Sequence, residues 1–328
     1  MTKLAVVGAT GLVGRKMLAT LERKQIPFDT LTLFSSARSA GEQVEFKGQT
    51  YTVRELTEAE AEQHFDYVLM SAGGGTSAHF SPIFEAAGAI VIDNSSQWRM
   101  ADDIDLIVPE VNRPEFKRGI IANPNCSTIQ SVVPLKLLQD AYGLSRVAYT
   151  TYQAVSGSGV KGRQDLIEGA NGKAPEAYPH PIYNNVLPHI DVFLEDGYTK
   201  EEQKMIDETK KILEQPDLGV TATCVRVPVL DSHSVHMSVT LDQPATVSEI
   251  QALFDQDDRV VLVDDPENNA YPLALHATDK DDIFVGRIRR DETLENTFHV
   301  WCTADNLLKG AALNAVQILE QVQNLRGV

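Results

Sequence analysis

The chain has 328 residues, enough for two domains with separate cores, and its formal charge of −17 argues against a nucleic-acid partner, which needs a basic face. No apolar run reaches the roughly 18–20 residues of a membrane span, so we expect a protein without a membrane partner. Three cysteines are too few for a disulfide framework and too scattered for a zinc site, which favours a reducing cytoplasm and no metal.

The N-terminal apolar segment Lys3–Val7 predicts a strand that begins almost at the first residue, so we expect no targeting peptide. An amphipathic helix is expected to follow and to reach about Lys24. The glycines between them permit a tight turn and a close backbone approach, and the helix N-terminus would present N–H groups to a pyrophosphate. Rather than a merely structural turn, we predict a dinucleotide site made by Gly8, Ala9, Thr10, Gly11, Leu12, Val13 and Gly14.

The end of the next predicted strand, Leu31–Phe34, indicates which dinucleotide binds. An NAD site usually has an acidic residue about 20 residues beyond the glycines, to bind the ribose 2′-hydroxyl. Here that place has no carboxylate, and its hydroxyls and guanidinium suit a 2′-phosphate. We therefore predict NADP as the cofactor, bound by Ser35, Ser36, Arg38 and Ser39.

The alternation of strands and helices continues to about residue 120 and predicts a doubly wound parallel sheet. A hairpin is expected to turn at Lys47-Gly48, and buried strands are expected at Tyr67–Ser71, Ala89–Asp93 and Leu106–Pro109. The first of these strands ends in a glycine-rich exit, which again is typical of a place where a cofactor crosses the sheet edge. We assign Ala72, Gly73 and Thr76 to the cofactor site.

A short strand that includes Ile121 is expected to stop at Pro124, where Asn125 takes the N-cap position of a helix. Cys126 then occupies the first helical position, where the helix dipole and unpaired N–H groups favour thiolate over thiol. This makes Cys126 a candidate nucleophile, although a small buried residue near a helix start is the alternative from this stretch alone.

Beyond this helix, long β-branched segments predict a second, α+β domain built on a large mixed sheet. A loop or small lobe is expected at Asp165–Asp191, and the amphipathic segment from Asp305 to Glu320 is expected to return to the first domain. We therefore divide the chain into an NADP-binding domain, 1–125 plus 305–328, and a catalytic and dimerisation domain, 126–304. The strands of the second are expected at Arg146–Val155, Val220–Leu230, Ser234–Leu241, Asp282–Arg289 and Phe298–Thr303.

A thiolate beside an NADP site can add to an aldehyde and leave a thioester after hydride transfer. Proton transfer needs a further group, and His233 is a candidate because it lies just past a predicted strand. That strand also carries Arg226 in an otherwise apolar run, which indicates a bound carboxylate or phosphate.

The sequence closely resembles the bacterial type of aspartate-β-semialdehyde dehydrogenase. The resemblance implies that the protein reduces β-aspartyl phosphate with NADPH to aspartate semialdehyde and phosphate, on the route to lysine, threonine and methionine. It also implies a homodimer. It runs the length of the chain, through 8–14 (GATGLVG), 35–41 (SSARSAG), 93–96 (DNSS) with Arg99, 108–112 (VPEVN), 123–128 (NPNCST), 152–157 (YQAVSG), 224–229 (CVRVPV) with His233, and 305–312 (DNLLKGAA).

The resemblance also assigns roles. It makes Cys126 the nucleophile and His233 the general acid/base, with Gln153 and Asn125 orienting the acyl group. It gives the substrate carboxylate to Arg226 and its ammonium to Glu201, with the adjacent Glu202 as the alternative. It gives the phosphate to Arg99 and Lys204, helped by Asn94 or Ser95, and it adds Ser156, Gly157, Gly159 and Asn306 to the cofactor site.

Three other interpretations compete with this one. N-acetyl-γ-glutamyl-phosphate reductase resembles the layout, but its acylated amine would have no use for Glu201. A glyceraldehyde-3-phosphate dehydrogenase would usually carry an acidic residue near Phe34 and use NAD. A non-catalytic NADP-binding regulator would have Cys126 as a redox sensor. It would leave four residues without roles, namely Arg99, Gln153, Arg226 and His233.

Overall fold

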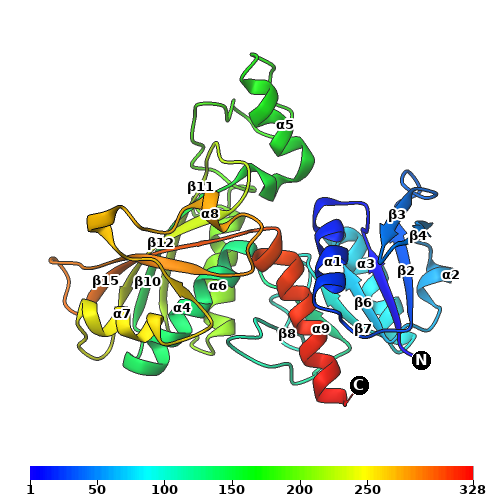
Figure 1. Ribbon diagram of the computed structural model, residues 1–328, viewed down its shortest axis with the longest axis horizontal. Coiled ribbons are helices and arrows are strands. Elements are labelled where there is room, and N and C mark those ends of the chain that lie inside the picture. Colours follow the sequence, from blue (N-terminus) through cyan, green and yellow to red (C-terminus); the bar gives the residue numbers. More distant parts are fainter. Residues whose placement is uncertain (328) are drawn as a thin grey trace. The chain divides into compact units, whose positions relative to one another are not determined.

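The computed structural model describes residues 1–327, which form two compact units (Figure 1). Unit 1 comprises residues 1–124 and 311–327, and unit 2 comprises Asn125–Gly310. The returning segment is expected to begin at Asp305. Asp305, however, accepts a hydrogen bond from the Asp279 N–H, and Asn306 accepts one from the Ser232 N–H, both in unit 2. No helix of the described chain is long and apolar enough to cross a membrane.

Unit 1 is built on a seven-stranded sheet in the order β5-β2-β1-β6-β7-β9-β8, and every pairing is parallel. The chain leaves β1 toward β2 on one side and continues with β6 on the other, which is the switch point of a doubly wound fold. The predicted fold class is confirmed. The strands are β1 (Lys3–Val7), β2 (Thr30–Ser35), β5 (Arg54–Glu55), β6 (Tyr67–Met70), β7 (Ile90–Asp93), β8 (Asp105–Leu106) and β9 (Ile120–Ala122).

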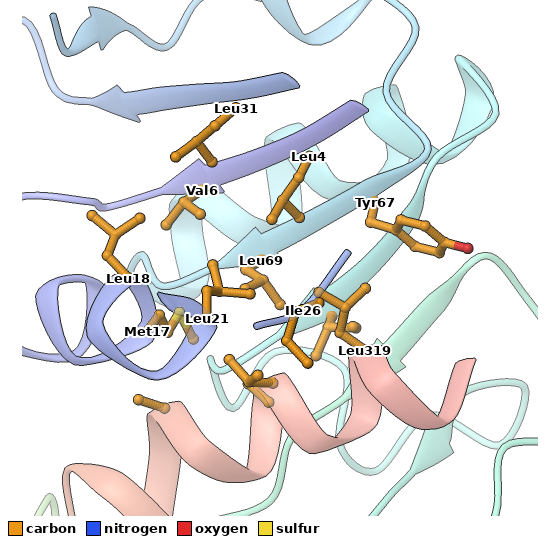
Figure 2. Packing of buried hydrophobic residues seen from close by; sticks show 14 of the residues in the cluster. Leu4, Val6, Met17, Leu18, Leu21, Ile26, Leu31, Tyr67, Leu69 and Leu319 are labelled. Carbon is orange, nitrogen blue, oxygen red and sulfur yellow. The ribbon is translucent and has the colours of Figure 1, made fainter. Parts of the chain in front are cut away.

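The helices α1 (Leu12–Arg23) and α9 (Leu313–Arg326) pack against the β1–β6 region of this sheet, as Figure 2 shows. Leu319 of α9 belongs to the same buried cluster as Leu4 and Leu69. The C-terminal segment therefore returns to unit 1 as expected, although its first turn, Leu308–Ala312, is a π-helix. The remaining elements are a hairpin, β3 (Gln43–Phe46) and β4 (Gln49–Thr52), and the helices α2 (Glu58–Ala61) and α3 (Gly74–Ala86).

Unit 2 contains a six-stranded mixed sheet in the order β11-β10-β12-β15-β14-β13. The pairs β10·β11 and β13·β14 are parallel and the other pairs are antiparallel, so the predicted large mixed sheet is confirmed. The strands are β10 (Arg146–Gln153), β11 (Gly219–Arg226), β12 (His233–Thr240), β13 (Val261–Leu262), β14 (Phe284–Arg290) and β15 (Thr297–Ala304).

The helices α4, α6 and α7 pack on this sheet (Figure 1), and α4 contacts β12 and β15 in its middle. Two expectations for unit 2 are wrong in detail. The strand predicted to reach Leu230 ends at Arg226, because Pro228 cannot donate to a ladder. The loop expected from Asp165 begins inside a helix that ends at Gly169. The helices are α4 (Cys126–Tyr142), α5 (Gly159–Gly169), α6 (Lys200–Ile212), α7 (Val247–Asp255) and α8 (Ala274–Ala277), with 3₁₀ turns at Val155–Ser158 and Pro266–Asn268.

Candidate active site

Cys126 is the first residue of α4, and the Asn125 side chain caps this helix as the sequence predicts. The Oδ1 atom of Asn125 accepts hydrogen bonds from the N–H groups of Ser127 (2.9 Å) and Thr128 (3.3 Å). Cys126 is partly exposed, whereas the other two cysteines are buried. Burial raises the pKa of Cys302 to about 12 and also raises that of Cys224. Cys126 is therefore the cysteine suited to nucleophilic chemistry.

The main chain of Gly310 lies directly against Cys126. A Cβ atom added at Gly310 would stand 2.9 Å from the Cβ of Cys126, closer than real Cβ contacts allow. A side chain at this position would displace the cysteine or the turn that carries Gly310. The glycine thus permits the close packing that fixes where the Cys126 side chain begins.

A buried carboxylate, Glu201 on α6, connects Asn125 to the end of β10. Its Oε1 accepts hydrogen bonds from Asn125 Nδ2 (2.9 Å) and Gln153 Nε2 (3.1 Å), and Lys204 Nζ lies 3.2 Å from its Oε2. Burial alone would raise the pKa of Glu201, but the Lys204 ammonium and the two amide donors together lower it. Glu201 is thus an ionised carboxylate that is only 5% exposed.

The neighbouring Glu202 has a different environment. One of its oxygens accepts from the Thr199 N–H (2.7 Å) in a capping box, and the other accepts from the Cys224 N–H (2.9 Å). Both oxygens are therefore engaged by the main chain, which ties α6 to β11. Of the two adjacent glutamates, Glu201 is the one whose partners include the Asn125 and Gln153 side chains.

The main chain of Ala154 binds both Arg226 and His233. Its carbonyl accepts from a terminal nitrogen of Arg226 (2.7 Å), and its N–H donates to Nδ1 of His233 (3.0 Å). Gly157 packs against both side chains, since a Cβ there would lie 2.8 Å from the guanidinium and 3.3 Å from the imidazole. One turn after β10 therefore holds the cationic and imidazole groups together.

Several buried polar atoms of these residues have no hydrogen-bond partner within the described chain. They include Nε of Arg226 and Nε2 of His233, and these side chains are 4% and 0% exposed. The hydroxyls of Ser127 and Thr128, just after Cys126, are in the same condition. Unsatisfied buried groups are rare in proteins, and those of Arg226 and His233, which bind the same residue, are typical of a ligand site. Burial, with Arg226 nearby, lowers the pKa of His233 well below its usual value, so the ring is neutral at pH 7.

Two predicted cofactor residues also meet in unit 2. Ser156 Oγ hydrogen-bonds both amide atoms of Asn306, at 3.2 Å to Oδ1 and 3.0 Å to Nδ2. Gly159, another predicted cofactor residue of unit 2, has φ +72° at the start of α5, a conformation that favours glycine.

In unit 1, the first two glycines of the predicted motif have different structural roles. Gly8 has φ +77°, and a Cβ there would collide with the Ser71 carbonyl at 2.1 Å. Gly11 is the N-cap of α1, makes no side-chain cap, and would meet nothing closer than 3.4 Å. The main chain therefore explains Gly8, whereas Gly11 leaves the start of the helix open to a ligand.

The start of α3 is similarly open. Gly73 is its N-cap without a side-chain cap, and Cβ atoms at Gly73 and Gly75 would meet nothing within 4 Å. Because β1 and β6 are adjacent parallel strands, α1 and α3 begin at the same edge of the sheet. The next strand, β2, ends there in Ser35, whose hydroxyl lies 3.1 Å from that of Thr10, followed by the exposed Arg38.

Arg99, also in unit 1, is 8% exposed and donates to two main-chain carbonyls, those of Asn123 and Asn94, at 2.9 Å each. Ser95 donates to Asp93 (2.6 Å), and the Asn94 Oδ1 is buried without a partner in the described chain. Arg99 and Asn94 are thus in contact, as the sequence grouped them, while Ser95 is bound to a carboxylate.

Sequence reasoning missed three residues that shape the site: Ala154, Asp191 and Gly310. Ala154 contributes main-chain atoms only, and Gly310 matters because it has no side chain that would collide with Cys126. Neither role can be recognised from the type of residue in the sequence. Asp191 lies in a loop and has φ +68°. Its Oδ2 accepts a hydrogen bond from the Lys204 ammonium at 2.7 Å. Among the described residues, no group of three or more His, Cys, Asp or Glu side chains could hold a metal ion.

Comparison with known proteins agrees with this architecture. The NAD-binding domain of semialdehyde dehydrogenases matches residues 3–118, and the dimerisation domain of semialdehyde dehydrogenases matches residues 135–309. Aspartate-semialdehyde dehydrogenase of Aquifex aeolicus (strain VF5) is 47% identical over 97% of either chain. That of Bacillus subtilis (strain 168) is 48% identical over 98% of this chain and 97% of the relative.

Solved structures show the same likeness. Aspartate semialdehyde dehydrogenase II of Vibrio cholerae, complexed with ASA, has a TM-score of 0.94 and 41% identity over 99% of this chain and 98% of that one. The Candida albicans enzyme with NADP has a TM-score of 0.77 and 26% identity, over 98% of each chain. The two domains are those of a semialdehyde dehydrogenase. The chain belongs to the aspartate-semialdehyde dehydrogenase family of oxidoreductases.

Proposed function

We propose that this protein reduces β-aspartyl phosphate to aspartate β-semialdehyde and phosphate with NADPH, through a thioester on Cys126. The observation that carries the proposal is a set of buried polar groups in unit 2 that is joined to the residue before one accessible cysteine by the Asn125–Glu201 hydrogen bond. Glu201 is an ionised carboxylate, and Arg226 is a buried guanidinium whose Nε has no partner in the described chain. A substrate carboxylate could bind Arg226 and a substrate ammonium could pair with Glu201, and an aspartyl group carries both charges.

The reaction then follows from what each residue can do. The Cys126 sulfur attacks the acyl carbon, and phosphate leaves with the electron pair of the broken C–O bond. Asn125 and Gln153 orient the acyl group, and His233 is the candidate acid/base at the carbonyl oxygen. NADPH, when bound, supplies the hydride that converts the thioester to a thiohemiacetal. The adduct collapses to the aldehyde and returns the Cys126 thiolate.

We assign the phosphate to Arg99 and Lys204, with Asn94 or Ser95 as neutral donors. These cations offset the repulsion that a chain of charge −17 exerts on a dianion. Lys204 holds Asp191 and Glu201 in the ligand-free protein, at 2.7 Å and 3.2 Å. Pairing of Glu201 with the substrate ammonium would weaken one of these contacts and leave Lys204 better able to bind phosphate.

Glu201 also distinguishes the proposal from N-acetyl-γ-glutamyl-phosphate reductase, whose substrate has no ammonium to meet a buried carboxylate. NADPH oxidation should therefore proceed with β-aspartyl phosphate and be at least about 10²-fold slower with N-acetyl-γ-glutamyl phosphate, because the acetylated substrate has no ammonium to bind Glu201. Parallel assays of both acyl phosphates at equal concentration decide the matter. Comparable rates, or faster reduction of the acetylated substrate, would contradict the proposal.

We assign the dinucleotide to unit 1, at the open starts of α1 and α3, with the 2′-phosphate on Ser35, Ser36, Arg38 and Ser39. NADPH should be favoured over NADH, and Arg38→Ala should raise the KM for NADPH roughly tenfold or more while leaving the KM for NADH nearly unchanged. Arg113→Ala, at another exposed arginine of unit 1, is the matched control. Equal use of both cofactors by the unmodified enzyme would refute this assignment.

We also propose that the protein is a C₂ homodimer, with the sheet of unit 2 as its interface. The sheet carries a hollow of about 490 Å³, and its lining includes Tyr152, Trp301 and His236. The ring centroids of Tyr152 and Trp301 lie 5.1 Å apart. Light scattering at micromolar concentration should give a dimer, and Trp301→Glu should convert it to a monomer. Leu325→Glu, at an exposed leucine of unit 1, should leave it dimeric. A monomeric unmodified protein would count against the interface.

A further inference from the structure

A lobe formed by residues 159–191 of unit 2 holds the main chain of Arg226 at the end of β11. The Leu187 N–H donates to the Arg226 carbonyl at 2.9 Å, and the Arg226 N–H donates to the Leu187 carbonyl at 2.8 Å. Leu187 also belongs to a small buried apolar cluster that includes Val155. Because Val155 begins the 3₁₀ turn after β10, this cluster fastens the lobe to the turn that follows β10.

The side chain of Tyr178, also in the lobe, covers the guanidinium of Arg226. The ring lies over Cζ of Arg226, with 6.0 Å between that atom and the ring centroid. Tyr178 is half-buried, and Arg226 is 4% exposed. An aromatic face attracts a guanidinium because the face of the ring carries partial negative charge, and the attraction is stronger for a cation shielded from water. The ring therefore stabilises this buried cation without neutralising it.

A buried carboxylate fixes the main chain around Tyr178. Asp165, on α5 and 8% exposed, accepts hydrogen bonds from three consecutive N–H groups, those of Glu176 (2.8 Å), Ala177 (2.7 Å) and Tyr178 (3.3 Å). Hydrogen bonds to a carboxylate are stronger than those between neutral groups. Gly162, on the same helix, permits a close approach, since a Cβ there would stand 2.7 Å from the Tyr178 hydroxyl oxygen. The helix α5 thus sets the place of the Tyr178 ring.

The contacts of the Arg226 guanidinium leave part of its edge open. One terminal nitrogen donates to the Ala154 carbonyl at 2.7 Å, and Nε has no partner in the described chain. The N–H groups of a guanidinium lie in its plane, so a ring over its face obstructs none of them. A carboxylate binds such a group in that plane, by two parallel hydrogen bonds. The ring and the carbonyl together therefore orient the open edge for a carboxylate.

We propose that Tyr178 is a positioning residue for the substrate carboxylate. Its ring fixes the plane of the Arg226 guanidinium, and Asp165 fixes the ring through the loop 176–178. This deepens the proposed function and rests on it. Without the ring, the guanidinium could rotate about its side-chain bonds, and carboxylate binding would have to restrict that rotation at a cost in entropy. The lobe therefore acts on substrate binding through Arg226, without touching the reacting atoms.

Removal of the ring separates this role from a merely structural one. Tyr178→Leu should raise the KM for aspartate semialdehyde roughly 3–30-fold, the range that a cation–π contact supplies, while the KM for phosphate stays the same. Tyr178→Phe keeps the ring and should remain within about threefold of the unmodified enzyme. Tyr183→Leu, at an exposed tyrosine of the same lobe, is the control and should leave both constants unchanged. An unaltered KM for the aldehyde in a folded Tyr178→Leu variant would overturn the proposal.

A double-mutant cycle tests whether Tyr178 acts through Arg226. In an Arg226→Ala background, Tyr178→Leu should change kcat/KM for aspartate semialdehyde by less than about twofold, because the group that the ring positions is gone. Losses that add in full would mean that the ring supports the fold in general, and they would overturn the proposal. Initial rates of the unmodified enzyme, the two single variants and the double variant supply the cycle.

Asp165→Ala is an independent test that leaves the ring in place. It should raise the KM for the aldehyde and not that for phosphate, because the loop 176–178 loses the acceptor of its three N–H groups. Thermal melting identifies the variants that are folded at the assay temperature. An unchanged KM for the aldehyde in folded Asp165→Ala would overturn the role assigned to Asp165. Failure of the unmodified enzyme to oxidise aspartate semialdehyde would instead reject the proposed function.

Discussion

Replacement of Cys126 by serine is expected to lower turnover of β-aspartyl phosphate by roughly 10³-fold or more, because a serine hydroxyl at this position is neither ionised nor a comparable nucleophile. Binding of NADPH should be unchanged, since we assign the dinucleotide to unit 1 and not to this side chain. Steady-state kinetics, together with fluorescence titration of NADPH, measure the two properties separately.

The buried Cys302 provides the matched control. Its thiol donates to the main-chain carbonyl of Gln130 at 3.2 Å, and its pKa is raised to about 12, so it has no access to substrate and little thiolate. Cys302→Ala should cost stability without comparable loss of kcat. Substantial turnover by the Cys126→Ser variant, or inactivation by Cys302→Ala in a protein that remains folded, would contradict the assignment of the nucleophile.

The second large effect is expected at Arg226. Arg226→Ala should raise the KM for aspartate semialdehyde and lower kcat, with kcat/KM falling roughly 10²–10⁴-fold. Loss of the carboxylate anchor removes binding energy and also misplaces the carbonyl relative to Cys126. The KM for phosphate should change little. Initial rates in the oxidative direction, with aldehyde and phosphate varied independently, give both constants.

Arg99 is the comparison that separates the two anions. In the oxidative direction, phosphate attacks the thioester, so Arg99→Ala should raise the KM for phosphate and largely spare that for the aldehyde. The same experiment should therefore show a raised KM for phosphate in Arg99→Ala and a raised KM for the aldehyde in Arg226→Ala. Unaltered phosphate kinetics in Arg99→Ala would mean that phosphate binds elsewhere.

Much of the fold could be predicted because local signals agreed with tertiary packing. Lys3–Val7 forms the predicted strand, and the Asn125 cap and the helix from Cys126 are as expected, since each depends on a few adjacent residues. Prediction was less reliable where structure overrides local pattern. The segment 305–320 reads as one helix, yet its first six residues belong to unit 2 and a π-helical turn, Leu308–Ala312, precedes α9.

Some residues of the candidate site could be predicted from their local sequence, whereas others depend on tertiary contacts. Cys126, Arg226 and His233 were identifiable because a thiol, a guanidinium and an imidazole each occupied an unusual sequence context. The choice between Glu201 and Glu202 could not be made from sequence, because it depends on the direction in which each side chain projects from the helix. Nor could the contribution of Ala154, because its main-chain atoms contact residues that the fold alone brings to it.

Trapping of the acyl-enzyme tests the central claim most directly. Enzyme mixed with β-aspartyl phosphate in the absence of NADPH should release about one equivalent of phosphate per active site and acquire an aspartyl group. Peptide mass spectrometry should locate that group on Cys126, and addition of NADPH should remove it as aspartate semialdehyde. Acylation of Cys224 or Cys302, or reduction of the substrate without any acylated cysteine, would contradict the mechanism.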